Sequence, residues 1–253
     1  MVGALLGFVI AGVCVAFIGM GLDIAPFIDP PSMGIVFGGI IGGLLIALPM
    51  DAVTGAPKVF LKALFYNAAD PVETIKKLCE YSELARRDGI LALENVLEGI
   101  TDPFLRQGLQ LAVDGTDPEL ITDIMETELD NLDNRHAMGK RVWDTFKNGG
   151  PSWGALGTVI GLIQMLRGGV EDPNALTAGM AVALITTFYG SMVASFAVGP
   201  MVDRMDTCHK DEMYIKAILM KGVMSIQAGD NPRILEQKLK VFVSPAKRGF
   251  GKE

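Results

Sequence analysis

Residues 151–166 read PSWGALGTVIGLIQML, and residues 175–202 read ALTAGMAVALITTFYGSMVASFAVGPMV. Neither stretch contains Asp, Glu, Lys, Arg or His, and two similar stretches, 3–22 and 32–50, lie near the start of the chain. A helix needs about 20 apolar residues to cross a bilayer. Apolar runs this clean rarely occur in soluble cores, so we expect four membrane spans rather than four buried helices of a soluble protein.

The basic residues predict how these spans are oriented. All 22 Lys and Arg residues except Arg167 lie in 51–150 or 201–253. Because basic segments stay on the cytoplasmic side, we expect both segments and both termini in the cytoplasm, with the chain in the bacterial inner membrane. The stretch 3–22 has no basic segment before it and no cleavage site after it. It is therefore expected to be a retained span rather than a removed signal peptide.

This topology divides the chain into four segments. We expect a first transmembrane hairpin at 1–50, a cytoplasmic helical domain at 51–150, the third and fourth spans at 151–202, and cytoplasmic C-terminal helices with a tail at 203–253. We find no alternation of polar and apolar residues long enough for a sheet. The expected fold class is all-α, a four-span transmembrane protein with a helical cytoplasmic insert.

Helix boundaries within the cytoplasmic segments are marked by Asp and Pro. An Asp that caps a helix, followed by a Pro in its first turn, is a typical start signal. This signal occurs at Asp70-Pro71, Asp102-Pro103 and Asp117-Pro118. The helices that begin there should cover 72–87, 104–113 and 119–147. A shorter helix is expected at 57–66, and the fourth span should continue as one helix from Ala175 to Gln227, interrupted at most at Pro200.

Small residues recur at four-residue spacing in the predicted spans. They are Gly3, Gly7 and Ala11; Gly34, Gly38 and Gly42; Gly154, Thr158 and Gly161; and Gly179, Ala183, Thr187, Ser191, Ser195 and Gly199. Such stripes let helices approach closely in lipid. The pattern fits packing within one chain and packing between copies equally well.

The sequence carries no signature of catalysis. It has two histidines and lacks the phosphate-binding loop, the GxSxG elbow and the HExxH motif. Cys14, Cys79 and Cys208 are not spaced for a metal or a disulfide. We therefore expect no enzyme activity, no catalytic residue, no metal and no cofactor. The acidic insert also argues against nucleic acid as a partner.

Hydroxyl groups are the main polar chemistry of the predicted spans. An ion carrier usually places a carboxylate inside the membrane, and these spans have none. They do contain hydroxyls, including those of Thr158, Thr186, Thr187 and Tyr189. If this protein conducts ions, another chain must supply the carboxylate, and the hydroxyls would line the path. Alternatively, the hydroxyls bond only to carbonyls of their own helix.

Several ordered stretches carry a family resemblance. They are ARRDGILALE at 85–94, LAVDGTDPELI at 111–121, DNRHAMG at 133–139, PSWGALGTVIGLIQML at 151–166, GMAVALITTFYGSMVA at 179–194 and IQAGDNPRILEQKL at 226–239. In these stretches the chain resembles the MotA/PomA family of flagellar motor stator subunits, within the MotA/TolQ/ExbB superfamily. ExbB and TolQ look like three-span proteins, so the N-terminal hairpin and the RRDG stretch favour MotA/PomA.

The resemblance implies a stator that couples inward flow of Na⁺ or H⁺ to rotation of the flagellar rotor. It implies a homopentamer around a single-span MotB- or PomB-type partner that supplies the ion-binding Asp. It also implies contact with the rotor protein FliG. The alternatives are an ExbB/TolQ-like or defence-type stator ring that energises another machine, and a passive membrane scaffold without transport.

The resemblance also assigns roles to individual residues. By position, Arg86, Arg87 and Glu94 match rotor-facing charges, although an ordinary solvated surface is the alternative for them. Asn95 and Leu97 stand where PomA-like members keep further acids.

Within the spans, Pro151 and Pro200 match two prolines that couple ion passage to conformational change. Thr158 and Thr186 match hydroxyls that sodium-type members place beside the ion, and this favours sodium. Thr187 and Tyr189 complete the expected ion pathway.

Overall fold

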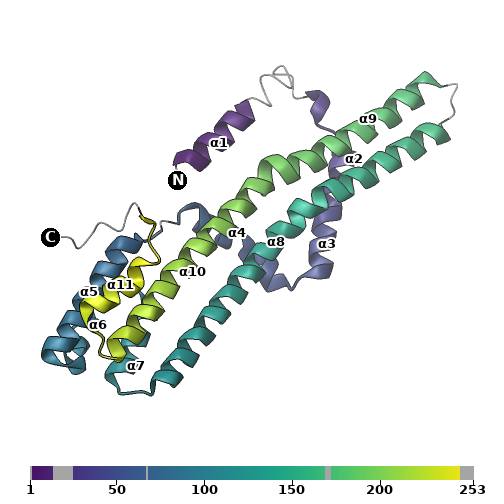
Figure 1. Ribbon diagram of the computed structural model, residues 1–253. Coiled ribbons are helices and arrows are strands. Elements are labelled where there is room, and N and C mark those ends of the chain that lie inside the picture. The colour runs from purple at the N-terminus through teal and green to yellow at the C-terminus, as the bar shows by residue number, and fades with distance from the viewer. Residues whose placement is uncertain (1, 14–24, 67, 169–171, 246–253) are drawn as a thin grey trace. The chain divides into compact units, whose positions relative to one another are not determined.

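The structure is a computed structural model, and it describes residues 2–13, 25–66, 68–168 and 172–245. Every regular element in these ranges is helical, which confirms the all-α prediction (Figure 1). In chain order the elements are α1 (Val2–Val13), η2 (Ala25–Phe27), α2 (Pro30–Met33), η3 (Gly34–Gly38), α3 (Gly39–Ala47), α4 (Met50–Leu64), α5 (Pro71–Asp88), η4 (Ile90–Leu93), α6 (Glu94–Leu97), α7 (Pro103–Val113), α8 (Pro118–Arg167), α9 (Pro173–Ser191), η5 (Met192–Val198), α10 (Gly199–Gln227) and α11 (Pro232–Lys240). The elements η2 and η4 are 3₁₀ helices, and η3 and η5 are π helices.

The helices form two compact units, each with its own core. Unit 1 comprises Met1–Tyr66 and His136–Thr207, and unit 2 comprises Asn67–Arg135 and Cys208–Glu253. The core of unit 1 is built from Val36, Ile40, Leu44, Leu48, Ala56, Val142, Tyr189, Val193, Val198 and Val202. The core of unit 2 joins α5, α7, α10 and α11, with Ile75, Leu78, Leu109, Ile218, Leu219, Leu235 and Leu239 at its centre.

The predicted helix starts in unit 2 are present with their caps. The Asp102 carboxylate accepts hydrogen bonds from the backbone N–H of Phe104 at 2.9 Å and of Leu105 at 3.2 Å. Asp70 caps α5 in the same way. The helix α5 ends before Gly89, whose φ of 90° lies in the region that favours glycine.

Three boundaries differ from the sequence prediction. The helix α4 begins at Met50 rather than at residue 57, and Pro57 lies inside it. The helix α8 continues through Pro151, so the predicted helix 119–147 and the predicted span 151–166 are one helix of 50 residues. Residues 173–227 are helical throughout, as expected, but the segment includes the π helix η5 directly before Gly199 and Pro200.

That π helix has a local physical cause. Pro200 has no N–H and cannot donate to the carbonyl four residues earlier, which disfavours regular α-helical bonding at this point. A π turn changes the bonding register to five residues. Gly199 is required there, because a Cβ at this position would lie 2.5 Å from the carbonyl oxygen of Ala194.

Among the residues that the structure describes, two segments are long and apolar enough to cross a membrane by length and composition, Ala25–Ala47 and Pro173–Gln227. The predicted span 3–22 falls partly outside the described residues, as does Cys14, and the predicted span 151–166 lies inside α8. The count of four spans and the four-segment division of the chain therefore stay predictions.

An ion pair fastens α7 to α10 in unit 2. The ammonium of Lys216 lies 2.8 Å and 3.0 Å from the two carboxylate oxygens of Asp102, the residue that caps α7. It also lies 5.0 Å from the centre of the Phe104 ring. The Lys216 side chain is only 13% exposed, so removal of its partner would leave a largely buried charge.

We predict that Asp102→Ala lowers the free energy of unfolding by about 2–3 kcal/mol, because it removes the cap and leaves Lys216 unpaired. Asp102→Asn, which keeps a capping oxygen, should cost less. Urea unfolding of the purified protein, followed by circular dichroism, measures both. Asp114→Ala at the exposed other end of α7 is the matched control. Equal stability of Asp102→Ala and this control would contradict the proposed coupling.

Candidate functional site

The helices α8 and α9 contact each other backbone to backbone. A Cβ on Gly161 would lie 2.6 Å from both the Ala183 nitrogen and the Gly179 oxygen. A Cβ on Gly150 would lie 2.6 Å from the Gly190 oxygen. Only glycine permits this approach, and the contact is made within one chain.

The predicted stripe of small residues on α9 is only partly correct. Gly179 and Ala183 lie in the contact with α8, but the contact continues through Thr186 and Gly190. Thr187, Ser191 and Ser195 are exposed instead. The reason is that strict four-residue spacing drifts around a helix of 3.6 residues per turn. Of these exposed hydroxyls, that of Thr187 still reaches α8, through its contact with Thr158.

Thr158 and Thr187 form a hydroxyl pair across α8 and α9. Their Oγ1 atoms lie 2.6 Å apart, and either can be the donor. Thr158 Oγ1 also lies 3.1 Å from the Gly154 oxygen and 3.2 Å from the Ala183 oxygen, and Thr187 Oγ1 lies 3.1 Å from that same Ala183 oxygen. Both hydroxyls thus bond to their own helices, as the alternative prediction held, and they also bond to each other.

This cluster holds four oxygen atoms, the two hydroxyls at an edge of the helix pair and two carbonyls that belong to the buried residues Gly154 and Ala183. Thr187 is exposed and Thr158 is half-buried. Hydroxyl and carbonyl oxygens are ligands for a hard cation, and hydroxyls can also pass a proton between carriers. The arrangement can therefore assist the passage of an ion, but it holds no carboxylate of its own.

Thr186 and Tyr189 are placed differently from this pair. Thr186 is fully buried, donates to the Val182 oxygen at 2.8 Å and packs against Gly157. Tyr189 is also buried; its hydroxyl donates to the Phe27 oxygen at 2.7 Å and accepts from the Asp29 N–H at 2.9 Å. Tyr189 thus ties α9 to the start of α2, where Asp29 is the N-cap.

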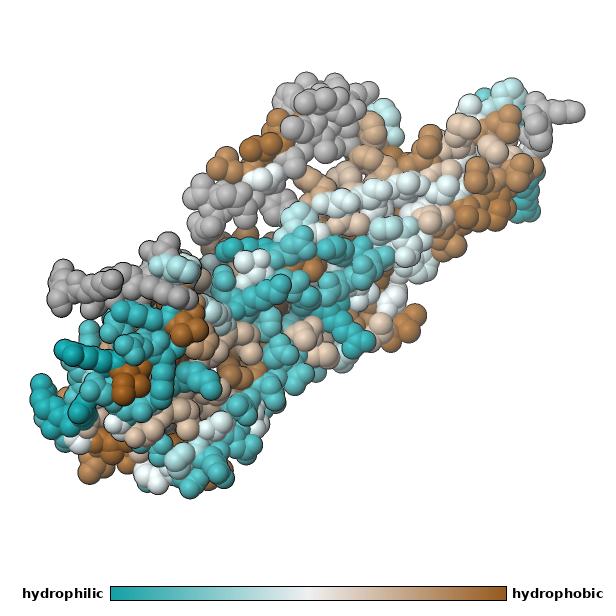
Figure 2. All heavy atoms as spheres, in the orientation of Figure 1, coloured by the Kyte–Doolittle hydropathy of each residue, from teal (hydrophilic) through white to brown (hydrophobic). Residues whose placement is uncertain are grey.

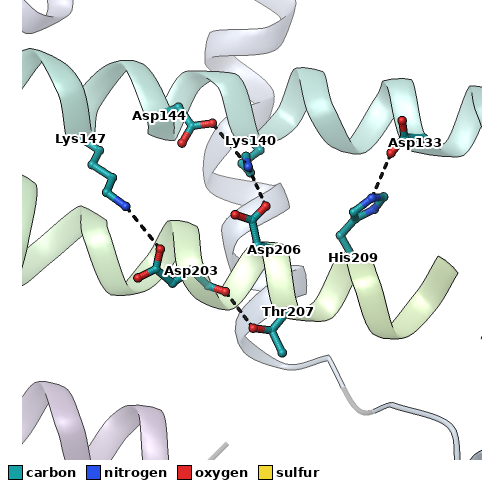
Figure 3. A network of polar contacts seen from close by, with 8 residues as sticks. All are labelled: Asp133, Lys140, Asp144, Lys147, Asp203, Asp206, Thr207 and His209. Carbon is teal, nitrogen blue, oxygen red and sulfur yellow. Dashed lines mark hydrogen bonds and ion pairs between the residues drawn. The ribbon is translucent and has the colours of Figure 1, made fainter. Parts of the chain in front are cut away.

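Ion pairs join α8 to α10 (Figure 3). Lys147 lies 3.3 Å from Asp203, and Lys140 lies 2.6 Å from Asp206 and 3.8 Å from Asp144. The hydrogen bond from Lys140 to Asp206 raises the pKa of the lysine. The pairs Lys147–Asp203 and Lys140–Asp206 join the two helices, whereas Lys140–Asp144 lies within α8. Pro151 and Pro200 are both exposed.

The sequence analysis missed these ion pairs. Lys140 and Lys147 are seven residues apart on α8, whereas Asp203 and Asp206 follow closely after Pro200. Two lysines at helical spacing before one matched proline and two aspartates at helical spacing after the other would have indicated that these two helices face each other. In unit 2 the same two helices are joined by His209 and Asp133, whose side chains lie 3.0 Å apart.

Arg86, Arg87 and Glu94 are all exposed in unit 2, on either side of the turn at Gly89. Arg87 pairs with its neighbour Asp88 at 2.8 Å. This contact lowers the pKa of Asp88. At residue 97, where PomA-like members keep an acid, this chain has Leu97. Its side chain is buried in the unit 2 core and anchors α6, which explains why an apolar residue stands there.

The surface of unit 1 is apolar beyond the hydroxyl pair. Figure 2 shows hydrophobic residues gathered over the ends of α8 and α9 that lie nearest their connection. The exposed apolar side chains there are Leu156, Val159, Leu162, Ile163 and Leu166 on α8, and Met180 and Leu184 on α9. Such a surface suits lipid or other apolar helices.

Comparison of the sequence with known proteins shows which family the chain belongs to. Residues 96–240 match the MotA/TolQ/ExbB proton channel family. The chain belongs to this family. It is 39% identical to Motility protein A of Borreliella burgdorferi over 98% of this chain and 94% of that relative. It is 34% identical to Chemotaxis protein PomA of Vibrio alginolyticus over 91% of this chain and 90% of that relative.

A solved structure shows the same likeness at the level of the fold. The flagellar MotAB stator complex from Bacillus subtilis matches with a TM-score of 0.84 and 31% identity, over 96% of each chain. The resemblance to the MotA/PomA family that the ordered motifs indicated is thereby confirmed. The similarity covers nearly the whole of both chains.

We predict that Gly161→Ala lowers the free energy of unfolding by about 1–3 kcal/mol, because the added methyl group forces α8 away from the backbone of α9. Gly42→Ala on α3 is the control, since a Cβ there meets no atom within 4 Å. Thermal unfolding in detergent measures both variants. If both variants unfold at the temperature of the parent protein, the backbone contact does not limit stability.

Proposed function

We propose that this chain is the ring-forming subunit of an ion-driven flagellar stator. The observation that carries the proposal is likeness along the whole chain to Motility protein A and to a flagellar MotAB stator complex. In this role the chain forms an ion channel with a partner and couples inward ion flow to rotation of the flagellar rotor. Its relatives are channel and motor proteins, and no enzyme activity is proposed.

The proposed partner is a MotB- or PomB-type protein with a single span. This follows from the chemistry of the spans, which contain hydroxyls but no Asp or Glu. A carboxylate supplied by the partner would provide the charged acceptor that a desolvated ion needs. The proposed assembly has five copies of this chain around the partner, in the inner membrane, with both termini in the cytoplasm.

The proposed ion path passes the hydroxyl pair of Thr158 and Thr187. Their exposed edge faces the position that a partner helix would take against α8 and α9, and their oxygens add to the ligands that the partner carboxylate offers. Thr186 and Tyr189 support this path by holding α9 in place. Thr186 fills the space beside Gly157, and Tyr189 fixes α9 to the start of α2.

The transported ion is proposed to be sodium. A proton can bind a carboxylate without further ligands, whereas Na⁺ needs several oxygens, and the cluster at Thr158 provides them. The name of the family refers to proton channels, so the ion carried by this member has to be measured.

Pro151 and Pro200 are proposed to couple ion passage to movement. A proline inside a helix removes one backbone hydrogen bond and permits bending at that point. Next to them, the pairs Lys147–Asp203 and Lys140–Asp206 hold α8 and α10 together. Bending at the prolines would then move α8 and α10 as one body on the cytoplasmic side.

Arg86, Arg87 and Glu94 are proposed to contact the rotor protein FliG. Their exposure makes them available to a partner, and charges of both signs favour a partner surface of mixed charge. The buried side chains of Leu93 and Leu97 hold this turn on the unit 2 core, so that the charges act from a fixed support.

The second candidate is an ExbB/TolQ-like or defence-type stator ring, because the matched family includes TolQ and ExbB. The neighbouring gene distinguishes the two functions. A partner with a peptidoglycan-binding domain supports the flagellar role. A passive scaffold is the remaining possibility, and it would give no ion leak when co-expressed with an unplugged partner.

We predict that motor speed follows the sodium concentration at fixed pH. Thr158→Ala should reduce speed most at low sodium, because it removes one oxygen ligand, while Thr158→Ser should keep near-parental speed. Tethered-cell rotation across a sodium series measures this. A speed that depends only on the proton gradient would show that the hydroxyl pair does not select sodium.

We predict that Arg86→Ala combined with Arg87→Ala abolishes swimming while ion leak through an unplugged complex persists. The reason is that the two residues lie on the exposed surface of unit 2, and none of the residues of the proposed ion path belongs to that unit. Lys76→Ala with Lys77→Ala, two exposed bases on the same helix, is the matched control. Normal swimming of the double arginine variant would remove these residues from the rotor contact.

A further inference from the structure

The helix α4 is amphipathic, and within the part of the chain that the structure describes one of its faces packs on α8 while the opposite face is exposed. Its inward face packs on α8: the Phe60 and Trp143 rings lie 5.5 Å apart, and Trp143 Nε1 donates to the Ala56 oxygen at 3.2 Å. A Cβ on Gly139 would lie 3.1 Å from Val59. These contacts fix which side of α4 turns outward.

The outward face combines an apolar strip with two lysines. Met50, Leu61 and Phe65 are exposed by 61%, 51% and 63%, and at 100° per residue they fall within one narrow sector of the helix surface. Lys58 and Lys62 are exposed in the adjoining sector, one turn apart. Asp51 also faces outward, at the end of α4 that adjoins α3.

The position of α4 along the chain puts this face at a membrane surface. It follows α3 after only Leu48 and Pro49, and α3 belongs to the segment Ala25–Ala47, which is long and apolar enough to cross a membrane. Both linking residues have extended backbone, with ψ of 147° and 146°, so the chain changes direction there.

The contact of α4 with α8 independently places α4 at the membrane surface. Trp143, on which α4 packs, precedes Pro151 and the predicted third span by eight residues, or about 12 Å of helix. The helix α4 is therefore held beside the cytoplasmic ends of two apolar segments. Apolar side chains bounded by lysines are the composition of a helix that lies in the headgroup layer.

We propose that the outward face of α4 binds anionic phospholipid headgroups of the inner leaflet, with Lys58 and Lys62 on the phosphates and Met50, Leu61 and Phe65 among the acyl chains. The lysine stems run along the apolar strip and bring their ammonium groups to headgroup level. This inference depends on placement of the chain in the membrane and not on its function in a motor.

The test measures lipid selection by the full-length protein. The chain is purified with its single-span partner in detergent and offered an equimolar mixture of phosphatidylglycerol and phosphatidylcholine. Native mass spectrometry then gives the ratio of the two lipids that remain bound. Wild type should prefer phosphatidylglycerol. Lys58→Gln and Lys62→Gln should each lower the ratio by about fivefold, and the double variant by more than either.

Lys76→Gln with Lys77→Gln on α5 carries the same loss of charge and should leave the ratio unchanged. An equal ratio in wild type and in the Lys58/Lys62 double variant would overturn the proposal, as would an equal loss in the α5 control. The same spectra report the subunit number. A changed subunit number with unchanged lipid selection would mean that a second copy, not lipid, covers this face.

Discussion

The close approach of α8 and α9 is the constraint on which the rest of unit 1 depends. Because Gly150, Gly154 and Gly161 admit the backbone of α9, the two helices meet backbone to backbone at these positions. This brings Thr158 within hydrogen-bonding distance of Thr187 and turns Tyr189 toward the start of α2. Without that contact the two hydroxyls would lie too far apart to bond, and no oxygen cluster would form.

The sequence was sufficient for the all-α fold, the family and most helix starts. These depend on local rules: an Asp-Pro pair marks a helix start, and α5, α7 and α8 begin where such pairs stand. Boundaries at proline were less predictable. Pro57 and Pro151 lie inside helices because tertiary packing on either side outweighs the loss of one hydrogen bond.

The candidate site was only partly predictable, for a related reason. Thr158 and Thr187 were named from their residue type, but their contact depends on the angle between two helices, which periodicity does not give. Tyr189 was expected with them and instead bonds to Phe27 and Asp29, far away in sequence. The ion pairs Lys147–Asp203 and Lys140–Asp206 were missed because each joins residues more than fifty positions apart.

The π helix η5 sets the angular phase of every later residue of unit 1. Each additional residue in a helix rotates the next side chain by about 100°. The turn Met192–Val198 thus determines that Asp203 and Asp206 face α8, while Thr186 and Gly190 do so before it. The segment therefore contacts α8 in two ways. Before the π helix it packs against α8 through the backbone at Gly190, and after the π helix it forms ion pairs with α8 through Asp203 and Asp206. The change from apolar to charged contact is thereby set where the π helix ends, directly before Gly199 and Pro200.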